Sequence, residues 1–330
     1  METTTGNTGQ GAPAAVTSST AANVPSAARA YTLAELIDAF MAAYAAADRS
    51  IGGRLDFWRR SLGDRPAAAI SSDDVADALD ALMQRSGKTF LGRDQNGAPR
   101  FKTRPGTIAG TTANRVLTSL GSVYKWSRRR RLLPRGFVSP TRGVERYPAG
   151  NHRVRYLDAA ERARLLAVCR IAAWSRLYLL VLMAITTGAR RGELLALKWC
   201  DIDLERRTAR VPTSKNGEPR TLVLVVPVLE EIARIKSHRP DDFVFASDKR
   251  PGRAMRIERA FRDAAAAARL QDFRFHDLRH TCASYLAQHG ASLLEIAETL
   301  GHRQLSMVKR YAHLSTAHKA RLAERVFGQL

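Results

Sequence analysis

The sequence is poor in cysteine and in long apolar runs, and each shortage excludes a class of protein. Its three cysteines, Cys169, Cys200 and Cys282, are odd in number, unclustered and set among apolar helix formers. This pattern indicates reduced side chains of a cytosolic protein and argues against a disulfide framework. The longest apolar run, Leu177 to Ile185, is too short to cross a bilayer, and no secretory leader opens the chain. We therefore expect a cytoplasmic protein with no membrane partner.

Acidic residues are also scarce relative to basic ones. The chain has 53 Lys and Arg against 31 Asp and Glu, which gives a net charge of +22 and a pI near 10.9. Residues 1–30 carry one acid, Glu2, and one base, Arg29, so the whole surplus belongs to the rest of the chain. We expect these first residues, mostly Thr, Ser, Ala, Gly and Pro, to form a disordered tail. A surplus this large attracts phosphate, so the folded part is expected to bind nucleic acid.

Apolar periodicity predicts a helical domain over residues 31–134. Thr32-Leu33-Ala34-Glu35 has the spacing of a capping box, and further helices are expected near 73–83 and 112–126. The last of these ends in a basic run that includes Lys125, Arg128 and Arg129. Such a run can be a solvated helix end, but in a chain this basic a phosphate contact is at least as well supported.

Residues 87–106 interrupt the helical pattern. Asn96-Gly97 is a possible hairpin turn. The segment has one acidic residue and five basic residues, namely Lys88, Arg93, Arg100, Lys102 and Arg104. Two interpretations stay open: a solvated loop, or a loop that contacts DNA through basic side chains such as those of Arg93 and Lys102.

A second domain is expected over residues 156–330, after a linker rich in Pro, Gly and Arg at 135–155. Helices are predicted near 158–173 and 176–187. Strands at 208–213 and 220–225 flank the turn Asn216-Gly217, with Lys215 immediately before it. Lys215 is therefore expected near the tip of a hairpin.

Motifs that can hold a phosphate follow one another in this second domain. Arg190 stands in Thr187-Gly188-Ala189-Arg190-Arg191-Gly192-Glu193, where a buried helix gives way to a turn. His276 and Arg279 are three residues apart and share one helix face. Tyr311 follows His302 by nine residues, which in one helix would put them on opposite faces, so a break between them is required. Alone, each of these residues is an ordinary surface side chain, but the combination is specific.

With these motifs in this order, the chain resembles the tyrosine recombinases of the phage-integrase family. The resemblance runs from about residue 155 to the C-terminus, and more loosely back to about residue 32. It implies a mainly α fold with a small antiparallel β-sheet, arranged as a two-domain C-shaped clamp of a helical DNA-binding domain and a mixed α/β catalytic domain. It also implies a site-specific recombinase, or integrase, that cuts and rejoins double-stranded DNA through a covalent 3′-phosphotyrosyl intermediate, and a nucleoid-associated place of work.

The resemblance gives particular residues a role. Tyr311 is implied to be the nucleophile, Arg190 and Arg279 to hold the non-bridging phosphate oxygens, and Lys215 to protonate the leaving 5′-oxygen. His276 is implied to assist the proton transfer from the tyrosine, and His302 to hydrogen-bond the phosphate. No metal and no cofactor are implied, and the sequence has no carboxylate pair with two-metal spacing.

An apolar stripe after the last motif, Leu322, Val326 and Phe327, can pack on its own domain or dock on a neighbouring subunit. The resemblance favours docking within a homotetramer on DNA. Two rival functions stay open: a type IB topoisomerase-like enzyme that nicks and reseals one duplex, and a catalytically silent DNA-binding relative.

Overall fold

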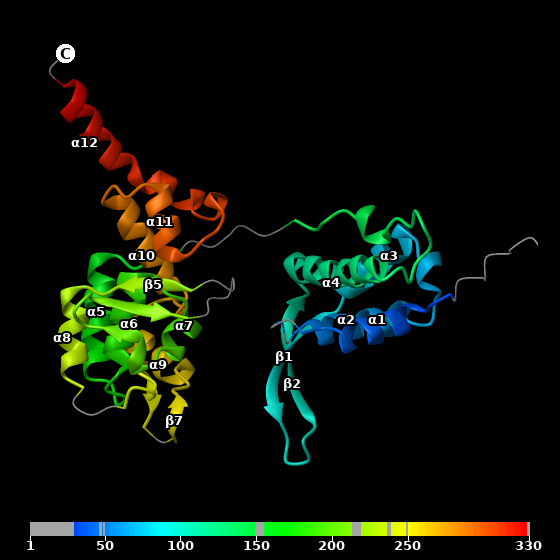
Figure 1. The fold of residues 1–330 in the computed structure, drawn as a ribbon, viewed down its shortest axis with the longest axis horizontal. Helices are drawn as coiled ribbons and strands as arrows, with labels where there is room; N and C mark the ends of the chain where they lie inside the picture. Colours follow the sequence, from blue (N-terminus) through cyan, green and yellow to red (C-terminus); the bar gives the residue numbers. More distant parts are fainter. Residues whose placement is uncertain are drawn as a thin grey trace, which may run out of the picture. The chain divides into compact units, whose positions relative to one another are not determined.

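The computed structural model describes residues 30–328 except 46, 47, 49, 149–154, 213–218, 236–238 and 249; at 88–91, 93, 99, 104, 251, 315–317, 319, 321 and 322 it describes the backbone alone. The expected tail, residues 1–30, lies outside the described residues except for residue 30. The chain divides into two compact units, Met1–His152 and Arg153–Leu330. It is mainly helical with small antiparallel sheets, as the sequence predicts (Figure 1).

Unit 1 is a helical bundle. Its helices are α1 (Leu33–Ala42), α2 (Ile51–Leu62), α3 (Ser72–Met83) and α4 (Gly110–Arg129), with 3₁₀ turns η1 (Ala67–Ala69) and η2 (Pro140–Arg142). The predicted capping box of α1 is confirmed, because Glu35 N donates to Thr32 Oγ1 and Thr32 N donates to Glu35 Oε2. Trp58 and Tyr124 are buried in the core, and each donates a side-chain hydrogen bond to a backbone carbonyl of another segment. Buried polar tips satisfied in this way fix how the helices pack.

The segment between α3 and α4 is a β-hairpin. Strands β1 (Ser86–Arg93) and β2 (Pro99–Thr107) pair antiparallel, with Lys88 opposite Thr103 and Phe90 opposite Phe101. Gly97 has φ +80 in the turn, which confirms the predicted turn at Asn96-Gly97. Figure 1 shows both strands extending away from the helices of unit 1.

Unit 2 is built around α6, whose residues are buried along almost its whole length. The small sheet has the order β3-β4-β5, all antiparallel. The first elements are α5 (Ala159–Arg170), α6 (Leu177–Thr187), α7 (Arg191–Ala196), η3 (Trp199–Asp201), β3 (Ile202–Asp203), β4 (Thr208–Val211), β5 (Arg220–Val223) and α8 (Val226–Ala233). They are followed by β6 (Ala246–Ser247), β7 (Arg250–Ala254), α9 (Glu258–Ala267), α10 (Asp277–Gln288), α11 (Leu293–Leu300), η4 (Leu305–Met307), η5 (Lys309–Ser315) and α12 (Thr316–Phe327).

The C-terminal elements of unit 2 form a cluster of their own. Ala283, Ile296, Leu300, Val308 and Tyr311 pack together there, which joins α10, α11, η4 and η5. Helix α12 leaves this cluster and extends outward (Figure 1). Among the helices of the described residues, none is long and apolar enough to cross a membrane.

Candidate active site

Arg190 lies in the short connection between α6 and α7. Helix α6 ends at Gly188, which adopts φ +60, a left-handed conformation that glycine enters without a Cβ penalty. A Cβ on Gly188 would lie 2.4 Å from Leu300 of α11 and 3.2 Å from the Cys282 sulfur of α10. The chain therefore turns where α6 packs closely against α10 and α11, and this places Arg190 beside them.

A buried carboxylate orients Arg190. Glu193 Oε1 accepts a hydrogen bond of 2.7 Å from Arg190 Nη1, and Glu193 Oε2 accepts one of 2.9 Å from the Arg190 backbone. Burial alone would raise the pKa of the Glu193 carboxyl, but these hydrogen bonds and the charge of Arg220 outweigh it and hold the pKa below its ordinary value. Glu193 is therefore a fixed negative charge that sets the Arg190 rotamer.

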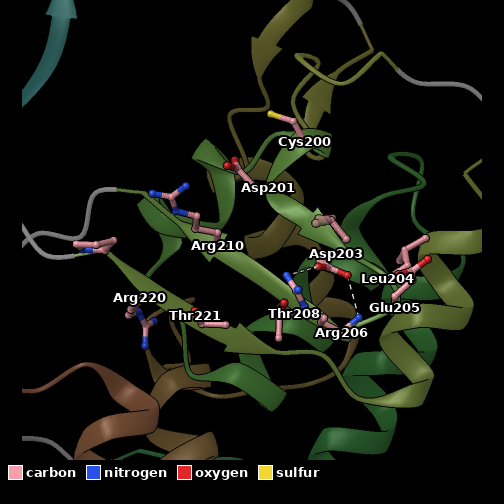
Figure 2. A pocket seen from close by; sticks show the side chains of 12 residues that line it. Cys200, Asp201, Asp203, Leu204, Glu205, Arg206, Thr208, Arg210, Arg220 and Thr221 are labelled. Carbon is pink, nitrogen blue, oxygen red and sulfur yellow. Dashed lines mark hydrogen bonds and ion pairs between the residues drawn. The ribbon is translucent and has the colours of Figure 1, made fainter.

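Arg220 is the second cation on Glu193. Its Nη2 lies 2.7 Å from Glu193 Oε2, and its Nη1 donates to the Thr299 carbonyl at 2.7 Å. Figure 2 shows Arg220 at the start of β5 with its guanidinium directed away from Cys200 and Asp201. Lys215, five residues earlier in the sequence, lies outside the described residues, so its predicted place at the hairpin tip stays a prediction.

The hollow drawn in Figure 2 lies over β3, β4 and β5 and has a volume of about 970 Å³. An ion pair of 3.6 Å between Asp203 and Arg206 crosses one side of it. Of the described side chains around the candidate site, the hollow shares only Arg220, and none of the described site residues predicted from the sequence lines it. The site is therefore a separate place, on the other side of Arg220.

Arg279 projects from α10 and is buried. Its Nη1 donates to the Gly188 carbonyl at 2.7 Å, while among the described residues its buried Nη2 has no hydrogen-bond partner. Burial, then the charges of Arg190 and Arg220, lower the pKa of Arg279 to about 9. Three guanidiniums thus converge with Glu193 as the carboxylate among them, which leaves net positive charge in a partly desolvated place. Such a place favours an anion.

His302 follows α11 at the left-handed Gly301, whose carbonyl lies 3.4 Å from Arg190 Nη2. Burial, then the charges of Arg279 and Arg190, lower the pKa of His302 to about 4, so its ring is neutral near pH 7. Its buried Nδ1 has no hydrogen-bond partner in the part of the chain that the structure describes. His302 therefore has a ring nitrogen available to a phosphate oxygen.

Tyr311 lies on η5 with 2% of its surface exposed. Its hydroxyl lies 2.5 Å from Nδ1 of His280, and burial raises the pKa of the phenol to about 12. The predicted break between His302 and Tyr311 is confirmed, because the 3₁₀ segments η4 and η5 separate Tyr311 from α11. The His276 ring stands 5.5 Å from the His280 ring, centroid to centroid, at the start of α10.

The structure thus places Arg190, Arg279, His302 and Tyr311 close together. His276 lies beside this group, because its ring is next to that of His280, which contacts Tyr311. The sequence motifs predict no function for His280, although its position four residues after His276 puts both rings on one helix face. Among the described residues, no group of His, Cys, Asp and Glu that could hold a metal ion is present.

The residues predicted to contact DNA away from the site all belong to unit 1. Lys102 is exposed on β2, and Lys125, Arg128 and Arg129 are exposed at the C-terminal end of α4. Arg93 lies on β1, where only the backbone is described.

Comparisons of the sequence with a family model and with known proteins all indicate the same family. Residues 155–318 match the model of the phage integrase family. The integrase of Salmonella phage P22 is 28% identical over 300 residues, which cover 83% of this chain and 74% of that protein. The type 1 fimbriae regulatory protein FimE of Escherichia coli K12 is 34% identical over 182 residues, 52% of this chain and 91% of FimE.

The fold is similar to that of an integrase of the transposon Tn1549, solved in complex with transposon right-end DNA. The TM-score is 0.64 at 15% identity, over 90% of this chain and 99% of that one.

Proposed function

This chain belongs to the phage integrase family, the tyrosine recombinases, and from that premise we propose how its own residues cut and rejoin DNA. It is a site-specific DNA recombinase, and its rivals, a nicking-resealing topoisomerase and a silent DNA-binding relative, are not favoured by relatives named integrase and recombinase. We place its work on chromosomal DNA in the cytoplasm, in association with the nucleoid.

The observation that carries the proposal is the convergence of Arg190, Arg279 and His302 beside Tyr311. Buried polar atoms cost free energy while they lack a partner, and Arg279 Nη2 and His302 Nδ1 are such atoms among the described residues. A phosphodiester oxygen supplies an acceptor for each. Guanidinium groups suit this task because they address two oxygens at once, in a geometry that a lysine lacks.

In the proposed reaction, Tyr311 Oη attacks the scissile phosphorus. The Oη–P bond forms as the P–O5′ bond breaks, which gives a 3′-phosphotyrosyl link and a 5′-hydroxyl. Lys215 supplies a proton to the leaving oxygen, and His276 assists removal of the phenol's proton. Arg190 and Arg279 stabilise the charge on the non-bridging oxygens in the transition state, with a hydrogen bond from His302. The 5′-hydroxyl of another strand reverses the attack and completes strand exchange, because the covalent link conserves the phosphodiester energy.

Unit 1 supplies phosphate contacts away from the chemistry in this proposal. The β1–β2 hairpin carries Arg93 and Lys102, and the C-terminal end of α4 carries Lys125, Arg128 and Arg129. A two-stranded ribbon is of a size that the major groove of DNA admits. The exposure of Lys102 and of the three α4 cations supports this role.

We assign assembly to α12. Val326 and Phe327 are 56% and 62% exposed at its far end. Exposed apolar side chains on a helix that extends from its unit suit a groove on another protomer. We propose that α12 docks on a neighbouring subunit and holds a homotetramer on the DNA.

Trapping the covalent intermediate tests the function. The substrate is a nicked duplex from the DNA flanking the encoding gene, chosen at short direct repeats, from which the 5′-hydroxyl fragment diffuses away. Wild type should form a covalent adduct in excess EDTA, since guanidiniums take the role that metal ions play in most nucleases. Tyr311→Phe should form none, while its DNA affinity stays nearly unchanged, because binding rests on many basic contacts. An adduct in the Phe variant, or one that needs added magnesium, would contradict the proposal.

A further inference from the structure

His280 is the side chain that the hydroxyl of Tyr311 contacts. The distance between Oη and Nδ1 is 2.5 Å, and the two rings lie 6.0 Å apart, centroid to centroid. Because the phenol is protonated, its O–H donates and Nδ1 accepts. His280 must then carry its own ring proton on Nε2. The reacting oxygen of the recombinase therefore already has a proton acceptor in place before DNA is bound.

The fold holds this pair in a defined geometry. His280 belongs to the first turns of α10, one residue after Arg279, whose guanidinium is tied to the Gly188 carbonyl. Tyr311 belongs to η5, which packs on α10, and it shares a buried cluster with Ala283 and Ala287 of that helix. The phosphate-holding arginine and the acceptor for the nucleophile are thus consecutive residues of one rigid helix, so their relative placement does not depend on a loop.

We propose that His280 is a catalytic residue of this recombinase: its Nδ1 aims the Tyr311 hydroxyl and receives the phenolic proton as Oη bonds to the phosphorus. The proposal rests on the proposed function of Tyr311 as nucleophile. The proton moves from Oη to Nδ1 while the Oη–P bond forms and the P–O5′ bond breaks. In the reverse step, His280 returns this proton to the phenol as the 5′-hydroxyl attacks. His276, whose ring stands beside that of His280, assists by acting through it.

The charged groups around His280 keep it in the accepting form. Burial lowers its pKa to about 4, the charges of His276, Arg310 and Arg279 act in the same direction, and Asp277 opposes them. His280 is therefore neutral near pH 7. A bound phosphodiester brings negative charge to this cationic surrounding and raises the affinity of Nδ1 for a proton when the transfer has to occur. The phenol also becomes a much stronger acid as its oxygen bonds to phosphorus, so proton transfer and bond formation go together.

The test is the rate of covalent adduct formation in a single turnover, on the nicked duplex described above, between pH 6 and pH 10. Wild type is compared with His280→Ala and with His280→Gln, whose amide can bond the hydroxyl but cannot take its proton. His289→Ala is the matched control, because His289 is an exposed histidine just after the same helix. Thermal unfolding and DNA affinity are measured for every variant.

Both His280 variants should form adduct about 10²- to 10⁴-fold more slowly than wild type near pH 7, the usual worth of a general base. Their rates should climb with pH, because hydroxide has to replace the lost acceptor, while affinity stays within about twofold. A wild-type rate in either variant, or a faster rate in His280→Ala, would overturn the inference. If wild type itself forms no adduct through Tyr311, the proposed function fails instead, so the two failures are distinguishable.

Discussion

Glu193 is the residue on which the cationic site depends for its stability. It lies buried between Arg190 and Arg220 and accepts hydrogen bonds from both. Without this carboxylate, guanidiniums would face one another in a place that water reaches poorly, and each would retain its desolvation cost. The same carboxylate fixes the rotamer of Arg190, so the stability of the site and the phosphate binding proposed for Arg190 depend on one side chain.

Replacement of Glu193 by Gln should therefore be costly and pH-dependent. We expect a loss of about 3–5 kcal/mol in the free energy of unfolding at pH 7, the usual cost of breaking a buried ion pair. A carboxyl whose pKa is depressed by folding stabilises above its ordinary pKa and loses that stabilisation as the pH falls. The difference between the variant and wild type should thus shrink as the pH falls through 4.5 and below.

Urea denaturation at pH 7 and pH 4 measures this difference, and Glu205→Gln, at an exposed position of the same unit, is the control. A difference that does not depend on pH would mean that Glu193 acts through its shape and not through its charge.

The role proposed for Lys215 can be isolated by changing the substrate. A sulfur at the bridging 5′ position leaves as a thiolate and needs no proton, unlike the alkoxide of normal DNA. Lys215→Ala should cleave normal DNA about 10²- to 10⁴-fold more slowly than wild type, but the sulfur substrate at nearly the wild-type rate. His302→Ala, which lacks a phosphate contact, should stay impaired on both.

Rates of adduct formation on the two substrates decide between these roles. If sulfur does not rescue Lys215→Ala, the lysine only positions DNA and the acid is another residue, with His276 the first to test.

Most of the side chains that the structure brings together at the candidate site could be predicted from the sequence, because the prediction depends on residue type and order. Arg190, His276, Arg279, His302 and Tyr311 stand in short motifs, and the required break before Tyr311 follows from helical periodicity alone. The partnership of His280 with Tyr311 could not be foreseen, because it depends on how η5 packs on α10. The same holds for Arg220, whose partners Glu193 and Thr299 are 27 and 79 residues away.

At the scale of elements, capped helices were easier to predict than short or interrupted ones. The helices that begin after Ser71 and Asp158 have capping boxes and start where expected. Helix α2 was missed although Ile51, Leu55, Trp58 and Leu62 recur on one face, because Gly52 and Gly53 weaken its first turn. Strands β6 and β7 give no periodic signal, because β6 has only two residues and β7 contains Pro251 and Gly252. Tyr311 stands on the 3₁₀ segment η5, which helical periodicity does not indicate.

The β1–β2 hairpin is an element whose charge can be removed without touching a core. Along β2, Arg100 and Lys102 alternate with Phe101 and Thr103, so the two cations share one face of the ribbon, and both are exposed. If the hairpin contacts the duplex, changing Lys88, Arg93, Arg100, Lys102 and Arg104 to Gln should make the salt dependence of binding shallower. The expected change is about 0.9 in log–log slope for each lost phosphate contact.

Binding isotherms at several salt concentrations measure this slope. Arg259→Gln with Arg262→Gln, at two exposed positions of α9, controls for the loss of net charge. A slope equal to that of wild type would mean that the hairpin is solvated and does not contact the DNA.

At the scale of the whole molecule, α12 is the segment proposed to join protomers on the DNA. Changing Val326 and Phe327 to Ser should leave single-protomer binding and adduct formation within about twofold, because no phosphate contact is lost. Complexes with more than one protomer on the DNA should weaken strongly, since the docked apolar side chains are the expected anchors.

Native gels and mass measurements of the DNA complexes decide this. Ile171→Ser, at an apolar position that is 85% exposed in the same unit, is the control. Unchanged higher-order complexes would mean that α12 does not hold the assembly.

The close packing at Gly188 also limits how this recombinase can be combined with its relatives. The ends of α6 and α11 and the middle of α10 meet around a position with no room for a methyl group. A chimera joined between residues 188 and 300 would take these three segments from two parents, with interfaces that were not shaped for each other. Exchange of target specificity is therefore best attempted by transplanting unit 1, with the junction before residue 155, so that all three segments come from one parent.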